Sequence, residues 1–600
     1  MQGTVSITLD DPAAADTILS VVLPDKKVIS SDDNSAGVGE SVALTNPGGG
    51  TYDAVACAFA GGAQNYHGKL VLHTAAPNDL ATPGGTAPGV MPPTYANHVA
   101  PGSMAKDAGE PSIGVNWKTG AAFLQAGLET DKILFDGAGR PTWSDVSSPT
   151  TSVTSLDPIL ASDDAHGRVF VSQLTAMDSL SAFTDDDGGT YSPSQGGGIP
   201  SGVDHQTLGS GPYPAGSMPG ALTAFPNAVY YCSQDLVTAF CARSDTGGIS
   251  FGAGVPLYTS ECGGLHGHVR VSPDGTVYVP NKACNGKQGV AVSTDAGLSF
   301  TVKTVPLSTP GDSDPSIAAG KDNTAYYGFT KGDGKAEIAV TRDHGRTFSK
   351  PVDVGAALSI QNAAFPEVIA GDGDRAAFAF LGTKTAGAAQ DSDFGKNAAK
   401  TAYTGGAYHL YIATTYDRGG HWSTVDATGN DPVQRGKICQ GGTVACGPRD
   451  RNLLDFMDIQ VDKQGRALVG WADGCTAGCV TSNQVSANTF SSKGVVSRQT
   501  SGKTLFAPVA AVVPPVVAGT PSQQPTAGAP GGGSGSGSGA ASGSGSGSGA
   551  GSAGAGSAGG AANPVSAGPS LPRTGLPLVV PVLGLALLLS AASIRRRRTT

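Results

Sequence analysis

The stretch STDAGLSF, residues Ser293–Phe300, decides how the middle of this chain is organised, because close copies of it recur. The copies begin at Thr184 (TDDDGGTY), Thr341 (TRDHGRTF) and Thr415 (TYDRGGHW), with a looser copy at Arg243 (RSDTGGISF) that has one extra residue before its aromatic and a degenerate copy that ends at Trp143 (LFDGAGRPTW). The shared pattern, Ser/Thr-x-Asp-x-Gly-x-x-aromatic, predicts a tight turn. Its Asp side chain accepts hydrogen bonds from the backbone of its own turn, and its Gly takes a positive φ without steric cost.

A second pattern alternates with this turn. It consists of an acidic residue or a histidine, an apolar strand, a turn of Gly, Asp or Asn, and a second apolar strand. Its copies begin at Glu110, Asp157, Asp204, His266, Asp314, Glu367 and Asp455. Most successive copies are roughly 50 residues apart, and such a period with several short strands per unit is typical of a β-propeller with four-stranded blades. The number of copies favours seven blades, with six as the alternative.

The turn motif resembles the Asp box, or BNR repeat, of sialidase-like propellers, and the resemblance covers residues 105–505. It implies that each motif forms the outer hairpin of a blade and that its aspartate is structural. These aspartates are Asp186, Asp245, Asp295, Asp343 and Asp417. The predicted fold class is therefore all-β, a six- or seven-bladed Asp-box β-propeller with seven blades favoured.

The N-terminal segment, residues 1–95, has short alternating apolar runs between Gly, Asn and Pro turns, which predicts a small β-sandwich. It weakly resembles accessory sandwich domains of secreted bacterial hydrolases. The first residues, MQGTVSITLDD, have neither the basic nor the apolar segment of a signal peptide. We therefore expect that the chain begins inside a domain, through a misassigned start or a truncation.

The segment 506–570 changes from a Pro-, Ala- and Val-rich composition to almost pure Gly, Ser and Ala. Such a chain cannot bury enough apolar surface to fold. We expect a disordered linker that spans the cell wall.

The C-terminal residues 571–600 contain three features in a fixed order: the pentapeptide Leu571, Pro572, Arg573, Thr574 and Gly575, an apolar run over 576–594, and arginines at 595–598. The run is long enough for one hydrophobic helix to cross a bilayer, and the arginines keep the tail cytoplasmic. This order resembles the sortase cell-wall sorting signal of Gram-positive bacteria. The resemblance implies a membrane stage during sorting, cleavage by sortase between Thr574 and Gly575, and attachment of Thr574 to peptidoglycan. The protein would then be extracellular and covalently attached to the cell wall, with a plain membrane anchor as the alternative.

The cysteine spacing bears on the compartment as well. Of the nine cysteines, eight lie in close pairs, and no pair has the Cys-x-x-Cys or Cys/His spacing of a zinc site. Short-range disulfides in an exported protein are the simpler interpretation. The expected pairs are Cys232–Cys241, Cys262–Cys284, Cys439–Cys446 and Cys475–Cys479, which leaves Cys57 over.

Propeller ligands usually bind at the end of the central channel where the innermost strands begin. At that rim the sequence places Glu110, Asp157, Asp204, His205, His266, His268, Asp314, Glu367, Asp455 and Asp458. Acids and imidazoles that converge from different blades suit a sugar, a cation or a proton-transfer reaction. The alternative for each residue is that an Asp at a strand start caps a backbone turn.

Local motifs leave the cofactor open. LHGHVR puts His266 and His268 on one side of a strand, where they either hold a metal, supply acid/base chemistry or form part of a turn. GDGD (371–374) and TDDDGG share features with Ca²⁺ loops but lack the trailing Glu, and both match hairpin turns. Arg449 and Arg451 in RDRNLLDFMD either reach an anionic ligand or pair with neighbouring acids. Ca²⁺ or another divalent metal is therefore a candidate cofactor, and none is certain.

The net charge of −10 and the lack of a basic patch argue against nucleic acid as a partner. Sialidases of the superfamily that this chain resembles bind the substrate carboxylate with three arginines, the first in an Arg-Ile-Pro motif. This chain has GEPSIGV at the corresponding place, and an acidic rim repels a carboxylate. Three functions remain: a wall-anchored propeller that binds a glycan or an extracellular protein at the rim, a glycoside hydrolase with a divergent two-carboxylate site, or a structural surface-layer protein.

Overall fold

The computed structural model of this chain describes residues 3–10, 16–22, 28–33, 40–45, 51–60, 67–74, 90–155, 157–175, 178–194, 204–217, 225–235, 238–447 and 449–507. The expected linker beyond Ala507, the sorting signal and the apolar run 576–594 lie outside these residues. Within the described ranges no helix combines the length and the apolar composition needed to cross a membrane.

The N-terminal strands form two antiparallel sheets. One has the order β4 (Glu40–Thr45), β1 (Gly3–Asp10), β6 (His67–Thr74), and the other the order β3 (Val28–Asp33), β2 (Asp16–Val22), β5 (Asp53–Ala60). Leu9, Leu19, Val21 and Val42 are buried together between them. Because alternate residues of a strand point to one face, Leu19 and Val21 both reach this core. Cys57 on β5 is an exposed free cysteine.

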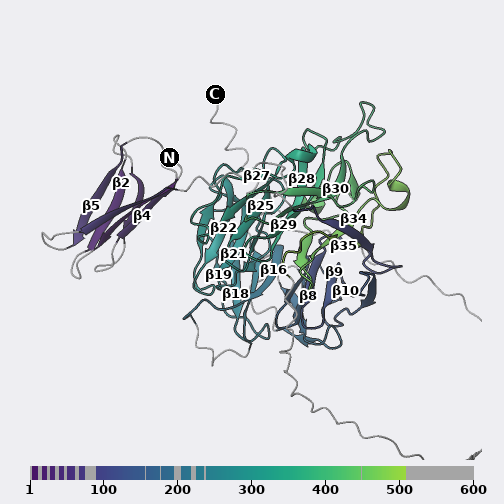
Figure 1. Cartoon of the computed structure of the whole chain (residues 1–600), viewed down its shortest axis with the longest axis horizontal. Coiled ribbons are helices and arrows are strands. Elements are labelled where there is room, and N and C mark those ends of the chain that lie inside the picture. The colour runs from purple at the N-terminus through teal and green to yellow at the C-terminus, as the bar shows by residue number, and fades with distance from the viewer. Residues whose placement is uncertain are drawn as a thin grey trace, which may run out of the picture. The chain divides into compact units, whose positions relative to one another are not determined.

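Seven antiparallel sheets of four or more strands follow in chain order and form a seven-bladed propeller (Figure 1). The prediction of seven blades is confirmed, and the six-bladed alternative is wrong. Blade 1 contains β8 (Ser112–Asn116), β9 (Ala121–Ala126), β10 (Glu129–Phe135) and β11 (Pro141–Asp145). Blade 2 contains β12 (Pro158–Asp163), β13 (Arg168–Leu174), β14 (Ser179–Thr184) and β15 (Ser192–Pro193). Blade 3 contains β16 (Asp204–Gly211), β17 (Ala228–Gln234), β18 (Ala239–Ser244) and β19 (Val255–Pro256).

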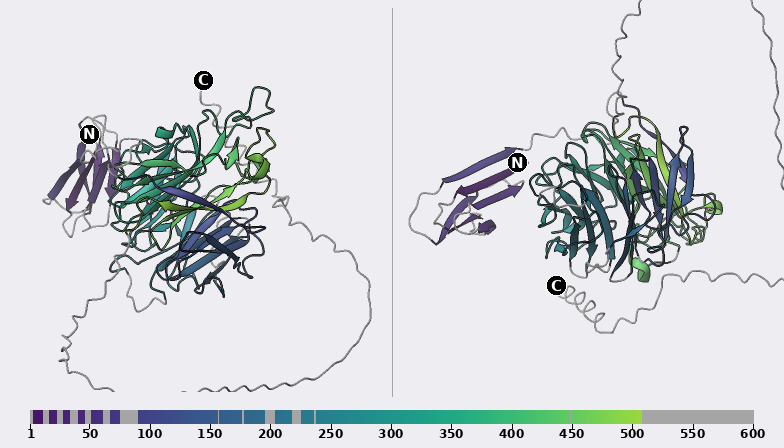
Figure 2. Two further views of the ribbon diagram at one scale, coloured as in Figure 1. Left: turned by 45° about the vertical axis from the view of Figure 1, so that its right-hand side comes forward. Right: turned by 90° about the horizontal axis from the view of Figure 1, so that it is seen from below.

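The remaining blades repeat the arrangement, and Figure 2 shows the sheets from two further sides. Blade 4 contains β20 (Arg270–Val271), β21 (Val277–Cys284), β22 (Lys287–Ser293) and β23 (Thr301–Thr304), and blade 5 contains β24 (Ser316–Ala319), β25 (Ala325–Thr330), β26 (Ala336–Thr341) and β27 (Val352–Asp353). Blade 6 contains β28 (Asn362–Ala370), β29 (Ala376–Thr383), β30 (Ala407–Thr415) and β31 (Ser423–Asp426), and β32 (Gln434–Arg435) also pairs with β30. Blade 7 contains β33 (Asp458–Val461), β34 (Ala467–Asp473), β35 (Lys493–Ser501) and β7 (Thr94–Val99). Short helical turns are η2 (Ala356–Leu358), α1 (Gly442–Ala445) and η3 (Ala477–Cys479).

The hydrophobic cores lie between blades rather than within them. Tyr326 of blade 5 and Phe378 and Phe380 of blade 6 belong to one buried cluster. Every residue of β25 and β29 is buried, because each sheet is covered on both faces by its neighbours. The second strands of these two blades, β25 and β29, are therefore largely apolar along their whole length. A blade has no complete hydrophobic core without the next blade.

The ring is closed by a strand from the start of the propeller. β7 pairs with β35 and so becomes the outermost strand of blade 7, with Thr94 opposite Ser501 and Val99 opposite Val495. The propeller thus begins at Thr94 rather than at residue 105, and residues 94–95 do not belong to the sandwich. The sequence TYANHV gave no such signal, because an outer strand is only partly buried and lacks an apolar run.

The last described residues, 503–507, join blade 6 to blade 7, and we call them the clip. Leu505 N–H donates to the carbonyl of Gly465 in blade 7 (2.7 Å), and its own carbonyl accepts from Asp372 N–H in blade 6 (2.9 Å). Arg375 donates to the carbonyl of Thr504 (2.9 Å), and the Ala507 N–H donates to the Asp372 carboxylate (2.7 Å). Leu505 itself is buried.

Four of the five predicted turns share one hydrogen-bond pattern. The Ser293 hydroxyl donates to Asp295 (2.7 Å) and accepts from the Gly297 N–H (2.8 Å), while Asp295 accepts from the N–H (3.0 Å) and hydroxyl (2.6 Å) of Ser299. Equivalent contacts surround Asp186, Asp343 and Asp417, with the His421 ring replacing the last hydroxyl at Asp417. A Cβ on Gly297 would lie 2.8 Å from Tyr230 of the preceding blade, so this glycine serves both a positive φ and close packing.

The fifth turn differs from the sequence alignment. Thr246, not Asp245, takes the aspartate position, because its hydroxyl accepts from the Ser250 N–H (3.0 Å) while Ser244 accepts from the Gly248 N–H (2.8 Å). The prediction that Asp245 is a box aspartate is therefore wrong by one position. With Thr246 in register, no extra residue precedes the aromatic. The Asp-x-Gly part of the sequence pattern therefore placed the aspartate position one residue too early, at Asp245 instead of Thr246.

Asp245 has different partners. It accepts hydrogen bonds from Arg243 Nε (2.8 Å) and from the Tyr213 hydroxyl (2.8 Å). The left-handed residues of this turn are Gly247 and Gly248, with φ of 69° and 91°. They correspond to Ala296 and Gly297, whose φ values are 61° and 77°.

The structure pairs eight cysteines as Cys232–Cys241, Cys262–Cys284, Cys439–Cys446 and Cys475–Cys479, the pairs that their spacing favoured. Cys232 and Cys241 lie directly opposite each other on β17 and β18. The last two disulfides lie in long loops of blades 6 and 7.

These turns yield a stability prediction. Asp295→Ala removes hydrogen bonds to Ser293 and Ser299, so we expect the free energy of unfolding to fall by about 1–3 kcal/mol. Asp245→Ala breaks a partly buried ion pair with Arg243 and one hydrogen bond from Tyr213 outside the turn, and we expect a smaller loss of about 1 kcal/mol. Denaturant titration of both variants measures the difference. Equal losses would contradict the displaced register.

Candidate functional site

The first strands of the seven blades, β8, β12, β16, β20, β24, β28 and β33, surround the central channel. All ten predicted rim residues lie at, just before or within these strands. Glu110 and His205 have left-handed backbone conformations, with φ of 56° and 51°, which are unfavourable for residues other than Gly and are often found at functional sites. The contacts divide the ten residues into two groups, which the sequence did not distinguish.

The first group gathers around Arg270, and we call it the inner cluster: His268, Arg270, Glu367 and Asp458. Arg270 Nη2 lies 2.9 Å from Asp458 Oδ1 and 3.9 Å from Glu367 Oε2. Blades 4, 6 and 7 thus meet through one guanidinium. Burial, together with the neighbouring Asp458, raises the pKa of Glu367 well above its ordinary value, and Arg270 opposes this.

The acids of the inner cluster also connect blades. Asp458 Oδ2 accepts from the Ile113 N–H (3.2 Å) and so joins blade 7 to blade 1. Glu367 Oε2 accepts from the Ser316 hydroxyl (2.9 Å), which itself accepts from the Val368 N–H (3.0 Å) and joins blade 5 to blade 6. The structural interpretation of an acid at a strand start therefore holds for these two residues.

The inner cluster has the spacing of a metal site. His268, Glu367 and Asp458 offer ligand atoms that all lie within 4.8 Å of one another, and His268 Nδ1 has no hydrogen-bond partner. However, Asp458 Oδ1 already accepts from Arg270 and from the Ile459 N–H (2.8 Å). The guanidinium thus supplies the positive charge that a metal would supply. Burial and the Arg270 charge hold the pKa of His268 well below its ordinary value, so its ring is neutral.

The second group lies at the entrance, and we call it the mouth. It contains Glu110, Asp157, Asp204, His205, His266, Asp314 and Asp455 together with two cations, Lys282 and Arg451. His205 Nε2 lies 2.5 Å from Asp314, and Lys282 Nζ lies 3.0 Å from the other Asp314 oxygen. Burial alone would lower the pKa of His205, but Asp314 and Asp204 raise it well above its ordinary value. His205 is therefore a cation at neutral pH.

A second ion pair closes another side of the mouth. Both Nη atoms of Arg451 donate to the two carboxylate oxygens of Asp455. Arg449 donates instead to the carbonyls of Ser486 (2.6 Å) and Asn488 (2.6 Å) and lies over the Phe490 ring. Each of these two arginines thus has partners within the chain.

Glu110 and Asp157 are the acids of the mouth that lack such a cation. Their exposed fractions are 6% and 5%, and no lysine or arginine in the described part of the chain forms an ion pair with either. Asp157 Oδ2 accepts from the Gln206 N–H (3.2 Å), whereas Oδ1 has no hydrogen-bond partner. Burial raises the pKa of Asp157 to about 7, although His205 opposes this. Burial, with Asp157 and Asp455 nearby, raises the pKa of Glu110 well above its ordinary value.

His266 completes the mouth. Its Nδ1 is 3.0 Å from the Gly267 carbonyl, its ring lies 6.3 Å from that of His205, and its Nε2 has no partner. Burial lowers its pKa to about 4. Buried polar atoms without partners are rare in folded proteins and call for bound water or a ligand. Among the described residues, three members of the mouth have such an atom: Asp157, His266 and Arg451.

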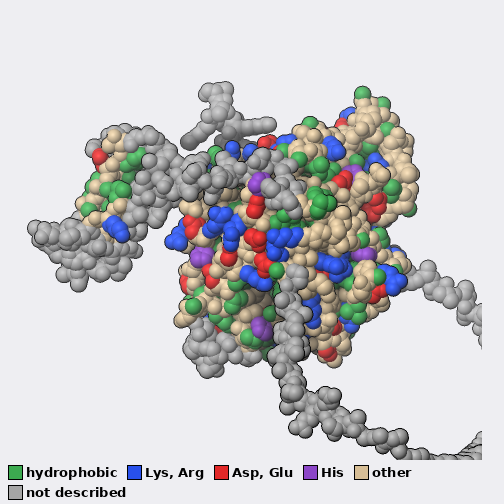
Figure 3. All heavy atoms as spheres, viewed as in Figure 1, with side chains coloured by type: hydrophobic (Ala, Val, Ile, Leu, Met, Phe, Trp, Pro, Cys, Tyr) green, Lys and Arg blue, Asp and Glu red, His purple; other side chains and the backbone are tan. Residues whose placement is uncertain are grey.

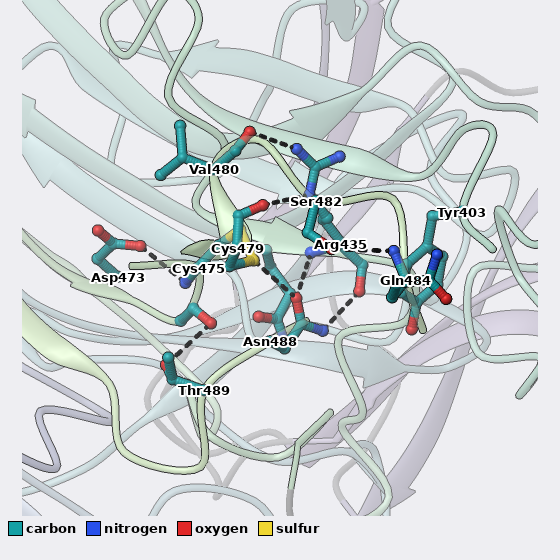
Figure 4. Close-up of a disulfide and its surroundings, with 12 residues drawn as sticks. Tyr403, Arg435, Asp473, Cys475, Cys479, Val480, Ser482, Gln484, Asn488 and Thr489 are labelled. Carbon is teal, nitrogen blue, oxygen red and sulfur yellow. Dashed lines mark hydrogen bonds between the residues drawn. A yellow bond between two sulfur atoms is a disulfide. The ribbon is translucent and has the colours of Figure 1, made fainter. Parts of the chain in front are cut away.

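Three long loops on blades 6 and 7 form a crest, residues 384–406, 427–457 and 474–492. Figure 4 shows its centre: Arg435 donates to the carbonyls of Cys479 (3.0 Å) and Val480 (2.7 Å), and Asn488 donates to the carbonyl of Arg435 (2.7 Å) beside the Cys475–Cys479 disulfide. The second loop delivers Arg451 and Asp455 to the mouth. The crest therefore holds one wall of the site in place.

Sequence reasoning missed two residues of the channel. Lys282 was not among the candidates, since a lysine inside β21 carries no motif. Asp164 follows β12 at the other end of the channel, and burial raises its pKa to about 7 despite a hydrogen bond from Ser162. Asp372 and Asp374 of the GDGD turn pair with Lys321 (3.1 Å), Arg375 (3.3 Å) and Lys503 (3.5 Å). Figure 3 shows basic and acidic side chains interspersed on one face.

No protein family model and no curated protein sequence matches the chain. Among solved structures it is similar to a protein of unknown function from Dyadobacter fermentans DSM 18053, at 12% identity and a TM-score of 0.34 over 69% of this chain and 99% of that one. Hadza microbial sialidase Hz136 gives 13% identity and a TM-score of 0.30 over 84% and 94%. The six-bladed lectin of Aleuria aurantia gives 13% and 0.34 over 56% and 96%.

The inner cluster predicts a large effect of one substitution. Arg270→Met leaves two buried acids without their cation, so we expect the free energy of unfolding to fall by about 3–5 kcal/mol. Adding Asp458→Asn removes one uncompensated charge and should recover part of the loss. Denaturant titration of the single and double variants checks this. A stable Arg270→Met protein would show that the guanidinium does not balance the cluster.

Proposed function

We propose that this protein is an extracellular, cell-wall-attached propeller that binds a glycan or protein ligand at the mouth. The observation that carries the proposal is the convergence of buried titratable groups from several blades, with polar atoms left unpaired at Asp157 and His266. Such groups cost stability unless a ligand or water satisfies them.

Two features support the extracellular location. Four disulfides are formed within the propeller, and disulfides persist in oxidising compartments. The pentapeptide, apolar run and arginines at 571–598 are arranged as in a sorting signal. Wall attachment through Thr574 rests on that resemblance.

A glycoside hydrolase is the second candidate, and the burial of Glu110 and Asp157 on neighbouring blades favours it. Two carboxyls whose environments raise their pKa values are a reasonable acid and base for glycosidic bonds. A carboxylate-binding site of the sialidase kind is less well supported. Arg270, Arg449 and Arg451 are each engaged by groups of the chain itself.

The test compares the full chain with Asp157→Asn and Asp314→Asn. Glycan arrays and a panel of extracellular proteins measure binding, and fluorogenic glycosides, sialosides included, measure hydrolysis with and without chelator. We expect a ligand whose affinity falls at least about tenfold in each variant, because both change the charge of the mouth. Asp333→Asn, on an exposed turn beside Lys331, is the charge-matched control. Binding that survives both mouth substitutions would place the ligand elsewhere, and turnover lost with Asp157→Asn would favour the hydrolase.

Wall attachment has its own test. The chain is expressed behind a secretion signal in a Gram-positive host with sortase, and wall and medium fractions are compared after muramidase digestion. We expect wild type in the wall fraction and Thr574→Ala in the membrane or medium. Ser570→Ala, just outside the pentapeptide, should behave as wild type. Equal distribution of all three proteins would contradict sorting.

A further inference from the structure

The cations of the mouth are engaged by three of its five acids. Asp455 is neutralised by Arg451, and Asp314 lies between His205 and Lys282. Asp204 lies 3.3 Å from the same His205 ring. Within the described part of the chain neither Glu110 nor Asp157 forms an ion pair, although the positive charge of His205 lowers the pKa of both.

The geometry of Asp157 points to a donor from outside. Its Oδ2 is held by the Gln206 N–H, so the side chain is fixed, yet Oδ1 has no partner although only 5% of the residue is exposed. The neutral His266 ring adds a second unpaired nitrogen to the mouth. A fixed, buried and unsatisfied acceptor beside a second unpaired acid is suited to a ligand that is positively charged and donates several hydrogen bonds.

We propose that the mouth binds a protonated primary amine on a narrow stem, the chemistry of a lysine side chain on an extracellular partner protein, with Glu110 and Asp157 as its direct acceptors. This inference rests on the proposed binding function and specifies its ligand class. An ammonium group carries three donors and one charge, which suits two buried acids that precede the first strands of neighbouring blades, where the charge of Asp157 acts on Glu110.

Burial decides between sources of the amine. Glu110 and Asp157 are 6% and 5% exposed, so only a slim group reaches them. Lysine carries its ammonium at the end of an unbranched four-carbon chain, whereas an amino sugar carries it directly on the ring. Ca²⁺ fits less well, because it takes six to eight oxygen ligands and the two histidines offer only nitrogen.

The inference has a pH signature. Below about 7 Asp157 is protonated, because burial raises its pKa, and a proton then occupies the place of the ammonium. Glu110 is affected in the same direction. His205 and Arg451 stay charged across this range, because nearby acids raise their pKa values, and so do Asp314, whose pKa is lowered by its cationic neighbours, and a lysine ligand. Binding therefore releases protons, and the affinity should rise with pH by up to about tenfold per unit per proton displaced, levelling off above the pKa of the acids.

The experiment uses the full chain and Nα-acetyl-lysine amide as the probe, with titration calorimetry between pH 5.5 and 8.5. Nα-acetyl-norleucine amide, which lacks the amine, and glucosamine are parallel probes. We expect binding of the lysine probe alone, at least tenfold weaker at pH 6 than at pH 8, with proton release seen as a buffer-dependent heat. Asp157→Asn and Glu110→Gln should each weaken it at least tenfold, and Asp333→Asn should not.

The outcomes are separable. Thermal unfolding verifies that the variants fold, and both substitutions keep shape while favouring the neutral state that burial already favours. Stronger binding of glucosamine than of the lysine probe overturns the lysine assignment in favour of an amino sugar. Equal binding of the norleucine probe overturns the amine. If no amine binds while another ligand is still lost in Asp157→Asn, the amine inference fails and the proposed binding function stands.

Discussion

Closure of the ring is the constraint on which the rest of this structure depends. Because the hydrophobic clusters lie between blades, no blade is complete until its neighbour is in place, and blade 7 is complete only when β7 pairs with β35. The same junction is fastened on the inside, where Asp458 accepts from the Ile113 backbone. Outer strand and inner acid together bring residues more than three hundred positions apart into the geometry of one channel.

The channel shows two uses of buried charge. In the inner cluster, Asp458 accepts from backbone N–H groups and from Arg270, and Glu367 accepts from the Ser316 hydroxyl, so both acids connect blades. In the mouth, Glu110 and Asp157 are equally buried but form no ion pair within the described ranges, and this difference separates the structural acids from the candidate binding acids. Burial raises the pKa of these acids in both groups, and the two groups differ only in the partners that the acids have.

Much of this organisation follows from periodicity. The repeated strand starts predict seven blades and place the ten acids and histidines around one channel, and local spacing predicts the disulfides. What the sequence could not supply depends on contacts between distant segments. β7 lacks the pattern of a blade because the strand that it pairs with lies some four hundred residues later in the chain. The role of Lys282 follows only from its ion pair with Asp314, which the sequence does not show. The sequence pattern did not reveal Thr246, because a threonine hydroxyl can accept the same hydrogen bond as the aspartate although the two residue types differ.

The clip at 503–507 has a mechanical consequence. It is the last part of the described chain, and under the proposed wall attachment any tension on the tether enters the propeller there. Backbone and side-chain hydrogen bonds hold it to Gly465 on one blade and to Asp372 and Arg375 on the next. The load is thereby shared across two blades before it reaches the β7–β35 seam, where Thr94 opposite Ser501 would otherwise be the first pair to peel open. Residues 503–507 thus protect the β7–β35 pairing, which closes the ring, from the full tension on the chain.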